Sequence, residues 1–280
     1  MSWQADGDKR WHELSRRLQA DSPDPDLRFL ILAAHSDDET IGASVLLSRF
    51  PKSHVVFLTD GAPRDTNLWS AGVNGSREEY AQMRREEAGR ALACAGIKGS
   101  QMCWLGVVDQ EAVFELANVI SRFCQLLTQI RPDAVVTHPY EGGHPDHDSA
   151  AFVASQAIAS MKEESAPLLI EMTSYHAHNG QCVTGEFLDA DPSAELCFEL
   201  SDADRDRKSR MFSAYDSQRL VLKTFRVDRE LLRVAPAYDF TRAPHEGKLW
   251  YECMGWPMTG VRWREIAAAA RGEMQEHSCR

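Results

Sequence analysis

The chain has 280 residues, of which 43% are hydrophobic, and its formal net charge at pH 7 is −11. A chain of this length and composition can bury a sizeable core, which excludes disorder throughout. The acidic balance argues against a nucleic-acid partner, and no stretch is long and apolar enough to span a membrane.

The first half of the chain alternates apolar runs with stretches typical of helices. An amphipathic helix is predicted at about 9–20. Leu27–Ala34 is apolar except for Arg28, as expected for a strand buried on both faces. Further strands are predicted at Val55–Leu58, Met102–Leu105 and Ala134–Thr137, with helices at Glu39–Arg49, Arg77–Ala95 and Glu111–Ile130. This alternation predicts a Rossmann-like, three-layer α/β/α fold with a mostly parallel sheet.

The pattern changes after Ala150. The segments predicted beyond it are helices near Ala151–Met161 and Asp202–Tyr215, a strand at Leu168–Tyr175, and short antiparallel strands at Cys197–Leu200 and Leu249–Glu252. We expect a single domain over residues 1–280, with a core at about 27–160 and a C-terminal elaboration at about 161–280.

The cysteines and the N-terminus bear on the cellular compartment. Seven scattered cysteines form no Cys-x-x-Cys pair, which indicates neither a disulfide framework nor a thiolate zinc knuckle. The N-terminal residues lack the apolar core of a signal peptide. We therefore expect a cytoplasmic protein with reduced thiols.

A histidine and two aspartates follow the first predicted strand, in the segment Ala34-His35-Ser36-Asp37-Asp38-Glu39. Ligands of open α/β sheets bind beyond the carboxyl ends of the strands. His35 and Asp38 can aim at one metal across a strand-to-helix turn, with Asp37 beside it, and nitrogen with oxygen donors suits zinc. The alternative is that Asp37 and Asp38 only cap the helix.

Three histidines and several carboxylates follow the fourth predicted strand, in the segment 137–148 (THPYEGGHPDHD). Its glycines and prolines indicate a tight loop. A plain polar surface loop is the alternative, although such loops seldom concentrate imidazoles. Because the two strand ends would lie side by side in one sheet, His147 is the natural third ligand. His144 is expected to face the open position of the metal.

The motifs AHSDDE and GGHPDHD resemble the two signatures of the LmbE-like, or PIG-L, family of zinc N-acetylglucosaminyl deacetylases. The family's first motif is usually Ala-His-Pro-Asp-Asp-Glu and its second is His-Pro-Asp-His. This sequence has Ser36 where proline is usual. The resemblance runs from about Leu27 to Ser160 and is fainter through Tyr215-Asp216-Ser217-Gln218.

The resemblance also implies roles for individual residues. It implies one Zn²⁺ per chain, bound by His35, Asp38 and His147. Asp37 would be the general base that activates water. His144 would stabilise the oxyanion and could protonate the leaving amine, while Asp146 would orient His144 and raise its pKa.

Two further residues are implied to contact substrate. Arg84 lies in a segment, MRREEA, that resembles the family's Arg-x-x-Glu-Ala helix. If the motif is shifted by one residue, Arg85 takes the place of Arg84. Alternatively, both arginines lie on a solvated face of the helix and do not contact substrate. Asp109 follows WLGVV, which resembles the family's Leu-Gly-x-x-Asp turn that contacts sugar hydroxyls. A plain loop aspartate is the other interpretation.

Other polar and aromatic residues allow a structural role. His176 and His178 could suggest a second metal, but a polar strand end is favoured because no carboxylate partner lies nearby in the sequence. An Asp-Gly turn explains Asp60 adequately, although it could also face the cleft. Three C-terminal tryptophans could stack on a sugar or an acyl chain, although core or subunit contacts are commoner: Trp250, Trp256 and Trp263.

The function implied is removal of an N-acetyl group from an N-acetylglucosamine-type amino sugar or glycoconjugate. One alternative is a related zinc amidase that cleaves a larger N-acyl group or a thiol-conjugate amide. The other is a binding protein without catalysis. The segment Pro63–Gly75 is long enough to act as a lid that controls pocket size. The sequence leaves the oligomeric state open, a homo-oligomer included.

Overall fold

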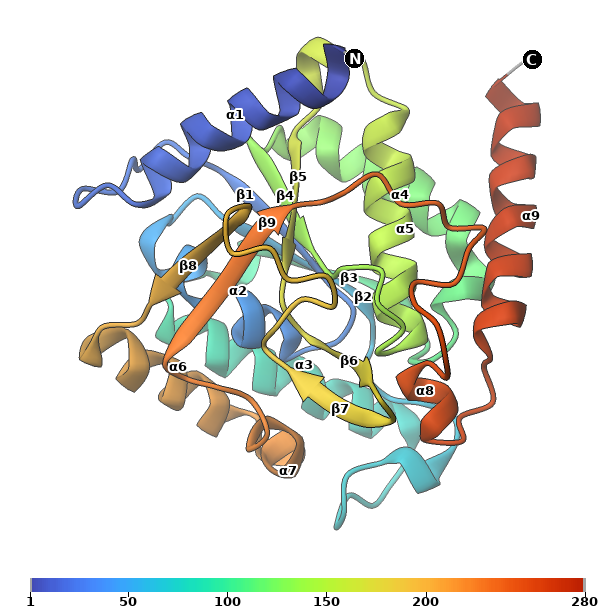
Figure 1. The fold of residues 1–280 in the computed structure, drawn as a ribbon. Helices are drawn as coiled ribbons and strands as arrows, with labels where there is room; N and C mark the ends of the chain where they lie inside the picture. The colour runs from blue at the N-terminus through green and yellow to red at the C-terminus, as the bar shows by residue number, and fades with distance from the viewer. Residues whose placement is uncertain (1, 279–280) are drawn as a thin grey trace.

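The apolar runs of the chain form a seven-stranded sheet in the computed structural model, which describes residues 2–278 (Figure 1). The strand order is β3-β2-β1-β4-β5-β9-β8. The strands are β1 (Phe29–Ala33), β2 (His54–Thr59), β3 (Met102–Val107), β4 (Ala134–Thr137), β5 (Leu168–Met172), β8 (Glu195–Glu199) and β9 (Arg229–Val234). The first five strands in this order, from β3 through β2, β1 and β4 to β5, pair in parallel. Strands β9 and β8 extend the sheet in antiparallel pairing. The expected Rossmann-like sheet is confirmed.

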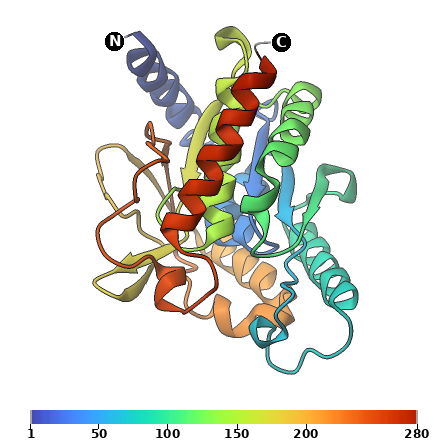
Figure 2. The same cartoon turned by 90° about the vertical axis from the view of Figure 1, so that its right-hand side faces the viewer.

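Helices cover both faces of this sheet, because its central strands are apolar on both sides. In β1, Phe29 and Ile31 belong to one buried cluster, while Leu30 and Leu32 belong to the other. The first cluster is completed by α1 (Ser2–Leu18), α2 (Asp38–Arg49), α3 (Arg77–Cys94) and α6 (Asp202–Ala214). The second is completed by α4 (Leu116–Ile130), α5 (Pro145–Ala159) and α9 (Gly260–Ser278). Figure 2 shows α9 running along the layer of α4 and α5.

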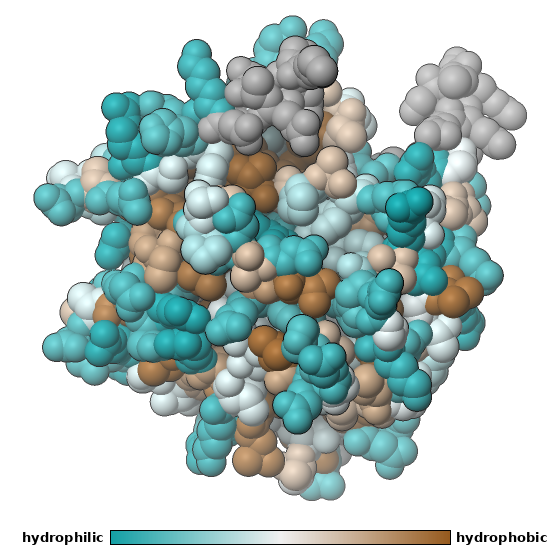
Figure 3. Space-filling view, viewed as in Figure 1, coloured by the Kyte–Doolittle hydropathy of each residue, from teal (hydrophilic) through white to brown (hydrophobic). Residues whose placement is uncertain are grey.

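Shorter elements connect these layers. A separate antiparallel hairpin is formed by β6 (Tyr175–His178) and β7 (Gln181–Thr184). The short helices are α7 (Arg219–Leu222) and α8 (Trp250–Cys253), with single 3₁₀ turns at Thr66–Leu68, Gly99–Gln101, Ala112–Glu115, Glu163–Ser165 and Asp216–Gln218. The surface in Figure 3 is mostly hydrophilic with scattered apolar residues. None of the helices described could cross a membrane.

Three expected elements differ from the structure. Helix α5 begins at Pro145, not near Ala151, because His144 forms the N-cap and Pro145 suits the first turn. The strand expected to reach Tyr175 ends at Met172, and Tyr175 starts the hairpin. The strand expected at Leu249–Glu252 is wrong. Helix α8 forms there, and its Glu252 carboxylate accepts the backbone N–H of Leu249 (3.0 Å).

Helix α2 is kinked and depends on the C-terminal half of the chain. Its backbone leaves helical geometry at Ala43 (φ −137°, ψ 19°). The buried carboxylate of Glu230 on β9 accepts the N–H groups of Ser44 (3.1 Å) and Val45 (3.0 Å). Lys208 on α6 pairs with Glu230 (2.7 Å). The backbone N–H groups of Ser44 and Val45 therefore both have a partner, despite the kink in the helix.

The six described cysteines are free thiols, and Cys279 lies outside the described residues.

Candidate metal centre and active site

The candidate site lies where the sheet changes direction of winding. Strands β1 and β4 are parallel neighbours, yet the helix after β1 packs on one face and the helix after β4 on the other. Crevices at such switch points, beyond the carboxyl ends of the strands, are where open α/β sheets bind ligands. The segment that carries His35 follows β1, and the segment that carries His144 and His147 follows β4. Both therefore begin at this point, as predicted from their positions after adjacent strands.

Three of the predicted residues form one group whose donor atoms could hold a metal ion. These are His35, Asp38 and His147, whose ligand atoms all lie within 4.8 Å of one another. Asp38 Oδ2 is 3.3 Å from His35 Nδ1, and Asp38 Oδ1 is 3.4 Å from His147 Nε2. The three residues are buried. Simple helix capping does not describe this arrangement, since Asp37 makes no side-chain capping bond and Asp38 accepts the N–H of His35.

His147 Nε2 is a buried nitrogen without a hydrogen-bond partner among the described residues. Its other nitrogen, Nδ1, lies 3.3 Å from Ser174 Oγ. Burial, reinforced by the neighbouring His138, lowers the pKa of His147 to about 3. The ring is therefore neutral at ordinary pH, and an unpartnered nitrogen of a neutral imidazole suits metal coordination.

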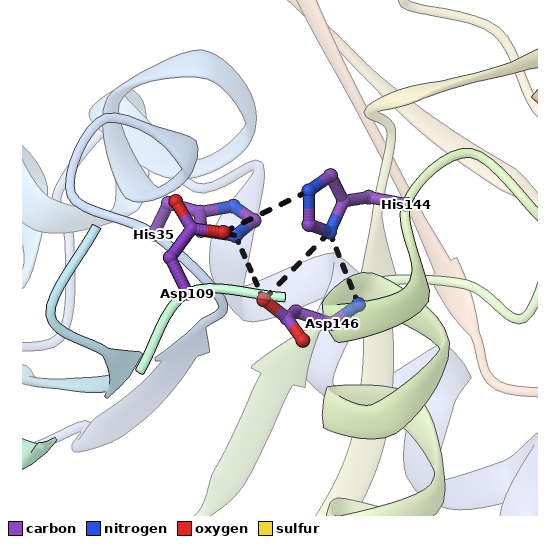
Figure 4. A group of neighbouring side chains, drawn as sticks. All are labelled: His35, Asp109, His144 and Asp146. Carbon is purple, nitrogen blue, oxygen red and sulfur yellow. Dashed lines mark hydrogen bonds and ion pairs between the residues drawn. The ribbon is translucent and has the colours of Figure 1, made fainter. Parts of the chain in front are cut away.

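The far side of the His35 ring faces two carboxylates (Figure 4). Its Nε2 lies 3.3 Å from Asp109 Oδ1 and 3.3 Å from Asp146 Oδ2. Burial alone would lower the pKa of His35, but these carboxylates outweigh it and raise the pKa well above its ordinary value. They can keep a proton on Nε2 while Nδ1 remains free to act as a ligand. Asp109 thus contacts a proposed ligand, a contact that its comparison with a sugar-binding turn did not anticipate.

The structure changes the expected relation between His144 and Asp146. His144 Nδ1 accepts the backbone N–H of Asp146 (3.1 Å), while the two side chains are 3.8 Å apart. The Asp146 carboxylate instead accepts the N–H groups of Gln110 (2.6 Å) and Ala112 (3.1 Å). Burial, together with neighbouring His35, holds the pKa of His144 well below its ordinary value. The pKa of His144 is therefore not raised overall, and Asp146 fixes the loop that carries Asp109.

Asp37 and Arg84 are in contact beside the metal group. Arg84 is 3% exposed, and its Nη2 donates to the Ser36 carbonyl oxygen and to Asp37 Oδ2 (3.3 Å). The solvated-face alternative for Arg84 is therefore wrong, and Arg85, the alternative in register, is exposed. Burial raises the pKa of Asp37 to about 7, against the opposing charge of Arg84.

Sequence reasoning missed the residues that hold this pair. The buried Glu39 carboxylate accepts the Asp37 N–H (2.9 Å) and the hydroxyl of Tyr215. Ser217 donates to Glu87 Oε2 (2.6 Å) and accepts from Arg84 Nη1 (3.4 Å). The only sequence signal for these contacts was the faint resemblance at 215–218.

His138 was also missed as part of the site. It is fully buried, and its Nε2 accepts the N–H of Ala34 (3.1 Å) at 3.3 Å from Asp38 Oδ2. Its ring stacks on His147 with centroids 3.9 Å apart. Because His138 Nε2 already accepts a backbone N–H, we interpret His138 as a residue that supports the proposed ligands.

The weaker candidates lie outside this cluster. Asp60 pairs with Arg77 and accepts the N–H of Ala62, as expected for an Asp-Gly turn. His176 is buried and its Nδ1 lies 3.2 Å from Glu141 Oε2, so a carboxylate partner does lie nearby in space. His178 is exposed. A cavity of about 720 Å³ lies between α1, α5 and β9, and none of the predicted site residues lines it.

Comparison with known protein families now identifies the segment that carries the site. The family model described as PIG-L, GlcNAc-PI de-N-acetylase, matches residues 30–158. These residues match that family, and we call them the PIG-L domain below. All eight residues predicted for the metal, the catalysis and the substrate lie inside it.

Curated relatives of the PIG-L domain include two sugar deacetylases. A 1D-myo-inositol 2-acetamido-2-deoxy-alpha-D-glucopyranoside deacetylase of Thermobifida fusca is 28% identical over 51% of this chain and 58% of its own length. A probable N-acetyl-alpha-D-glucosaminyl L-malate deacetylase 2 of Bacillus anthracis is 26% identical over 54% of this chain and 68% of its own length. The chain thus spans little more than half the length of the first relative.

Among solved structures, the N,N'-diacetylchitobiose deacetylase of Pyrococcus horikoshii has the same fold, with a TM-score of 0.52 and 18% identity. The similarity covers 84% of this chain and 94% of that one. It therefore extends beyond the PIG-L domain to the C-terminal strands and helices, and at this identity it shows the fold alone.

Proposed function

We propose that the chain is a zinc-dependent hydrolase that removes the N-acetyl group from an N-acetylglucosamine-type amino sugar or glycoconjugate. The observation that carries this proposal is the convergence of His35, Asp38 and His147 beside a buried carboxylate, Asp37. Two imidazole nitrogens and one carboxylate oxygen are a usual ligand set for catalytic zinc, which keeps a further position open.

The distances support zinc at this site. Donors of a tetrahedral zinc lie about 2.0–2.1 Å from the ion and therefore about 3.3 Å from one another. The imidazole nitrogens of His35 and His147 lie 3.3 and 3.4 Å from the two oxygens of the Asp38 carboxylate, close to that spacing. His147 Nε2 has no polar neighbour in the described chain besides this carboxylate, which would share the ion with it.

Zinc bound there would supply Lewis acidity, polarising the amide carbonyl and making water acidic enough to be deprotonated near neutral pH. Asp37 is the proposed base: it accepts the proton of the attacking water. Arg84 holds one oxygen of Asp37 in place and keeps part of its charge compensated. A carboxylate held beside the ion in this way is well placed for general-base catalysis.

His144 is proposed to stabilise the charge that develops on the carbonyl oxygen. Because Nδ1 accepts a backbone N–H, the proton of the neutral ring is on Nε2. A neutral imidazole with its Nε2–H directed to the reacting carbonyl can donate as negative charge grows. This replaces the imidazolium that we expected from the sequence.

The substrate class rests on the relatives. The two curated deacetylases differ in the group attached to glucosamine, inositol in one and malate in the other, but both names specify an N-acetylated glucosamine. We therefore propose the N-acetylglucosaminyl group as the common substrate part. Arg84 and Asp109 remain the proposed substrate contacts, Asp109 being the more accessible of the two.

Release of a primary amine from N-acetylglucosaminyl conjugates tests the proposal. Zinc-loaded protein should release amine, chelation should abolish release, and added zinc should restore it. His147→Ala should lower zinc content roughly tenfold, since three ligands leave no redundancy. Asp37→Ala should keep its zinc but lose activity.

The matched control for ligand loss is His54→Ala, which removes a half-buried histidine at the start of β2, away from the cluster. Full zinc content in His147→Ala would contradict the metal site. Release from larger N-acyl conjugates but not from N-acetyl ones would favour the amidase alternative. Zinc and sugar binding without any release would favour a binding protein.

A further inference from the structure

The C-terminal segment 249–260 is fixed onto the loop that precedes α5. Trp250 donates its backbone N–H to the Gly142 carbonyl oxygen (2.8 Å). Gly142 has φ +70°, and a Cβ there would lie 2.6 Å from the Leu249 side chain, so the close approach requires glycine. Trp263 Nε1 donates to the Pro145 carbonyl oxygen (3.1 Å). The segment therefore has a defined position against the PIG-L domain, although the family model does not include it.

This segment places the indole of Trp256 against the site. The ring lies 4.7 Å from the His144 ring, between centroids, at an angle of 65°. The backbone N–H of Trp256 donates to the Tyr251 carbonyl oxygen (3.0 Å), which holds the residue at the end of α8. The side chain is half-buried: it packs against the second core cluster and keeps part of its surface accessible.

The His144 ring is a neighbour both of this indole and of the polar groups of the site. Its ring is 4.4 Å from that of His35, and its Nε2 is 3.9 Å from Asp109 Oδ1. The site thus combines carboxylates and imidazoles with an adjacent aromatic ring. A pyranose matches such a pair of surfaces, because it has hydroxyl groups at its edge and C–H bonds on its faces.

We propose that Trp256 is a substrate-binding residue of this site, whose indole packs against the C–H face of the amino-sugar ring. The proposal rests on the proposed function for the identity of the sugar. A rigid aromatic side chain offers a large contact area at low cost in conformational entropy. The C-terminal elaboration would then supply a part of the specificity that the PIG-L domain lacks.

Calorimetric titration of the zinc-loaded protein with the two reaction products tests this. The probes are methyl glucosaminide, which has the ring, and acetate, which does not. Trp256→Ala should raise the Kd of methyl glucosaminide roughly tenfold and leave the Kd of acetate unchanged. Trp256→Phe, which keeps an aromatic ring, should stay within about threefold of the unsubstituted protein.

The matched control is Trp250→Ala, on the same segment. Trp250 is also half-buried, and no ring contact joins it to a site histidine within residues 2–278. An unchanged Kd of methyl glucosaminide in a folded, zinc-loaded Trp256→Ala protein would overturn the proposal. An equal loss for acetate would also overturn it, since the residue would then act through His144. Should Trp256→Ala not fold, Trp256→Leu takes its place, with the same two outcomes.

The two proposals fail differently. Binding of methyl glucosaminide without amine release from any N-acetyl conjugate defeats the proposed function and leaves Trp256 as a sugar contact. Failure of the unsubstituted protein to bind the glucosaminide overturns the role of Trp256.

Discussion

Asp37 shows how one residue is held in an unfavourable conformation at the proposed site. Its φ of +131° lies in the region that favours glycine, which costs of order 1–3 kcal/mol for another residue. Three contacts offset this cost: Glu39 accepts its N–H, while Arg84 bonds both its side chain and the preceding carbonyl. Such outliers persist only where the surroundings determine them, so Asp37, the proposed base, owes its position to these neighbours.

Tyr215 is predicted to be a positioning residue for Asp37. Tyr215→Phe removes only the hydroxyl that donates to Glu39. Glu39 is then less restrained, so kcat should fall roughly tenfold because the base is misplaced, while KM and zinc content stay unchanged. Steady-state kinetics and metal analysis measure these quantities. Tyr238→Phe, at a half-buried tyrosine that contacts Arg233 away from the site, should leave kcat unaltered. A kcat equal to that of the unsubstituted protein in Tyr215→Phe would contradict the role.

The sequence could predict the residues of the site better than their interactions. His35, Asp38 and His147 follow recognisable strands, so their proximity follows from parallel pairing alone. The protonation of His144 could not be predicted, because it depends on which backbone group faces Nδ1 and on burial. The contact of Tyr215 with Glu39 joins residues far apart in the chain, and no local pattern indicates it.

The kinked helix α2 is the element on which the site depends most. Its first turn carries Asp38, and its second half begins at Ser44, whose N–H is bonded to Glu230. Lys208 and Glu230 are both buried completely or nearly so. Removing one member of such a pair leaves an uncompensated charge in the interior, which is strongly destabilising.

Lys208→Met is therefore predicted to lower the free energy of unfolding by about 3 kcal/mol. Urea denaturation followed by circular dichroism measures this. Arg226→Ala breaks an ion pair with Asp228 in which both side chains are more than 40% exposed, and it should cost less than about 1 kcal/mol. Equal stability losses in the two variants would show that burial of the Lys208 pair is not what matters.

Elements were predictable where burial imposes a simple pattern. The strand at Ala134–Thr137 forms as expected, since all four of its residues are buried. The start of α5 was not predictable, because Gly142, Gly143 and Pro145 resemble a loop until His144 is seen to cap the helix. Leu249–Glu252 is partly apolar, and the helix that forms there is capped by the Glu252 carboxylate, which accepts the N–H of Leu249.

At the scale of the molecule, a second buried polar group joins the sheet to its antiparallel extension. Glu171 on β5 is 1% exposed and lies 2.9 Å from Arg233 Nε on β9. Arg233 also donates to Tyr238, and its guanidinium lies over Phe187. Burial raises the pKa of Glu171 from its ordinary 4.5 to about 8, against the lowering effect of Arg233.

This shift predicts a dependence of stability on pH. Between about pH 4.5 and 8 the folded state binds a proton at Glu171 that the unfolded state releases. The contribution of this proton to the free energy of unfolding is therefore complete below pH 4.5. It is lost as the pH rises to about 8, by at most about 1.4 kcal/mol per pH unit. Compared with Glu171→Gln, the unsubstituted protein should lose unfolding free energy from pH 5 to 8.

Urea denaturation at pH 5, 6.5 and 8 measures the difference. Glu78→Gln, at a carboxylate with a 75% exposed side chain, should follow the unsubstituted protein at every pH. Parallel pH curves for Glu171→Gln and the unsubstituted protein would contradict the raised pKa.

The fold as a whole also has a part that was predictable from the sequence and a part that was not. The parallel half was predictable from alternating apolar strands and helices. The antiparallel strand β9 was not anticipated, because its sequence, RELLRV, carries charges whose partners lie on other elements. Helix α9 packs on the second cluster through Trp263 and Ala267, with Ile266 and Ala270 partly buried beside them.

The bond between Glu230 and the kink of α2 has a consequence for the order of events during protein synthesis. The ribosome delivers the N-terminus first, so the PIG-L domain has left the exit tunnel before Glu230 is available. Until then the nascent chain has the proposed metal ligands but lacks Glu230 at Ser44 and Tyr215 at Glu39. The proposed active site is therefore completed late in translation, when the C-terminal strands dock, and a prematurely terminated chain would present the proposed ligands without the contacts that hold Asp37.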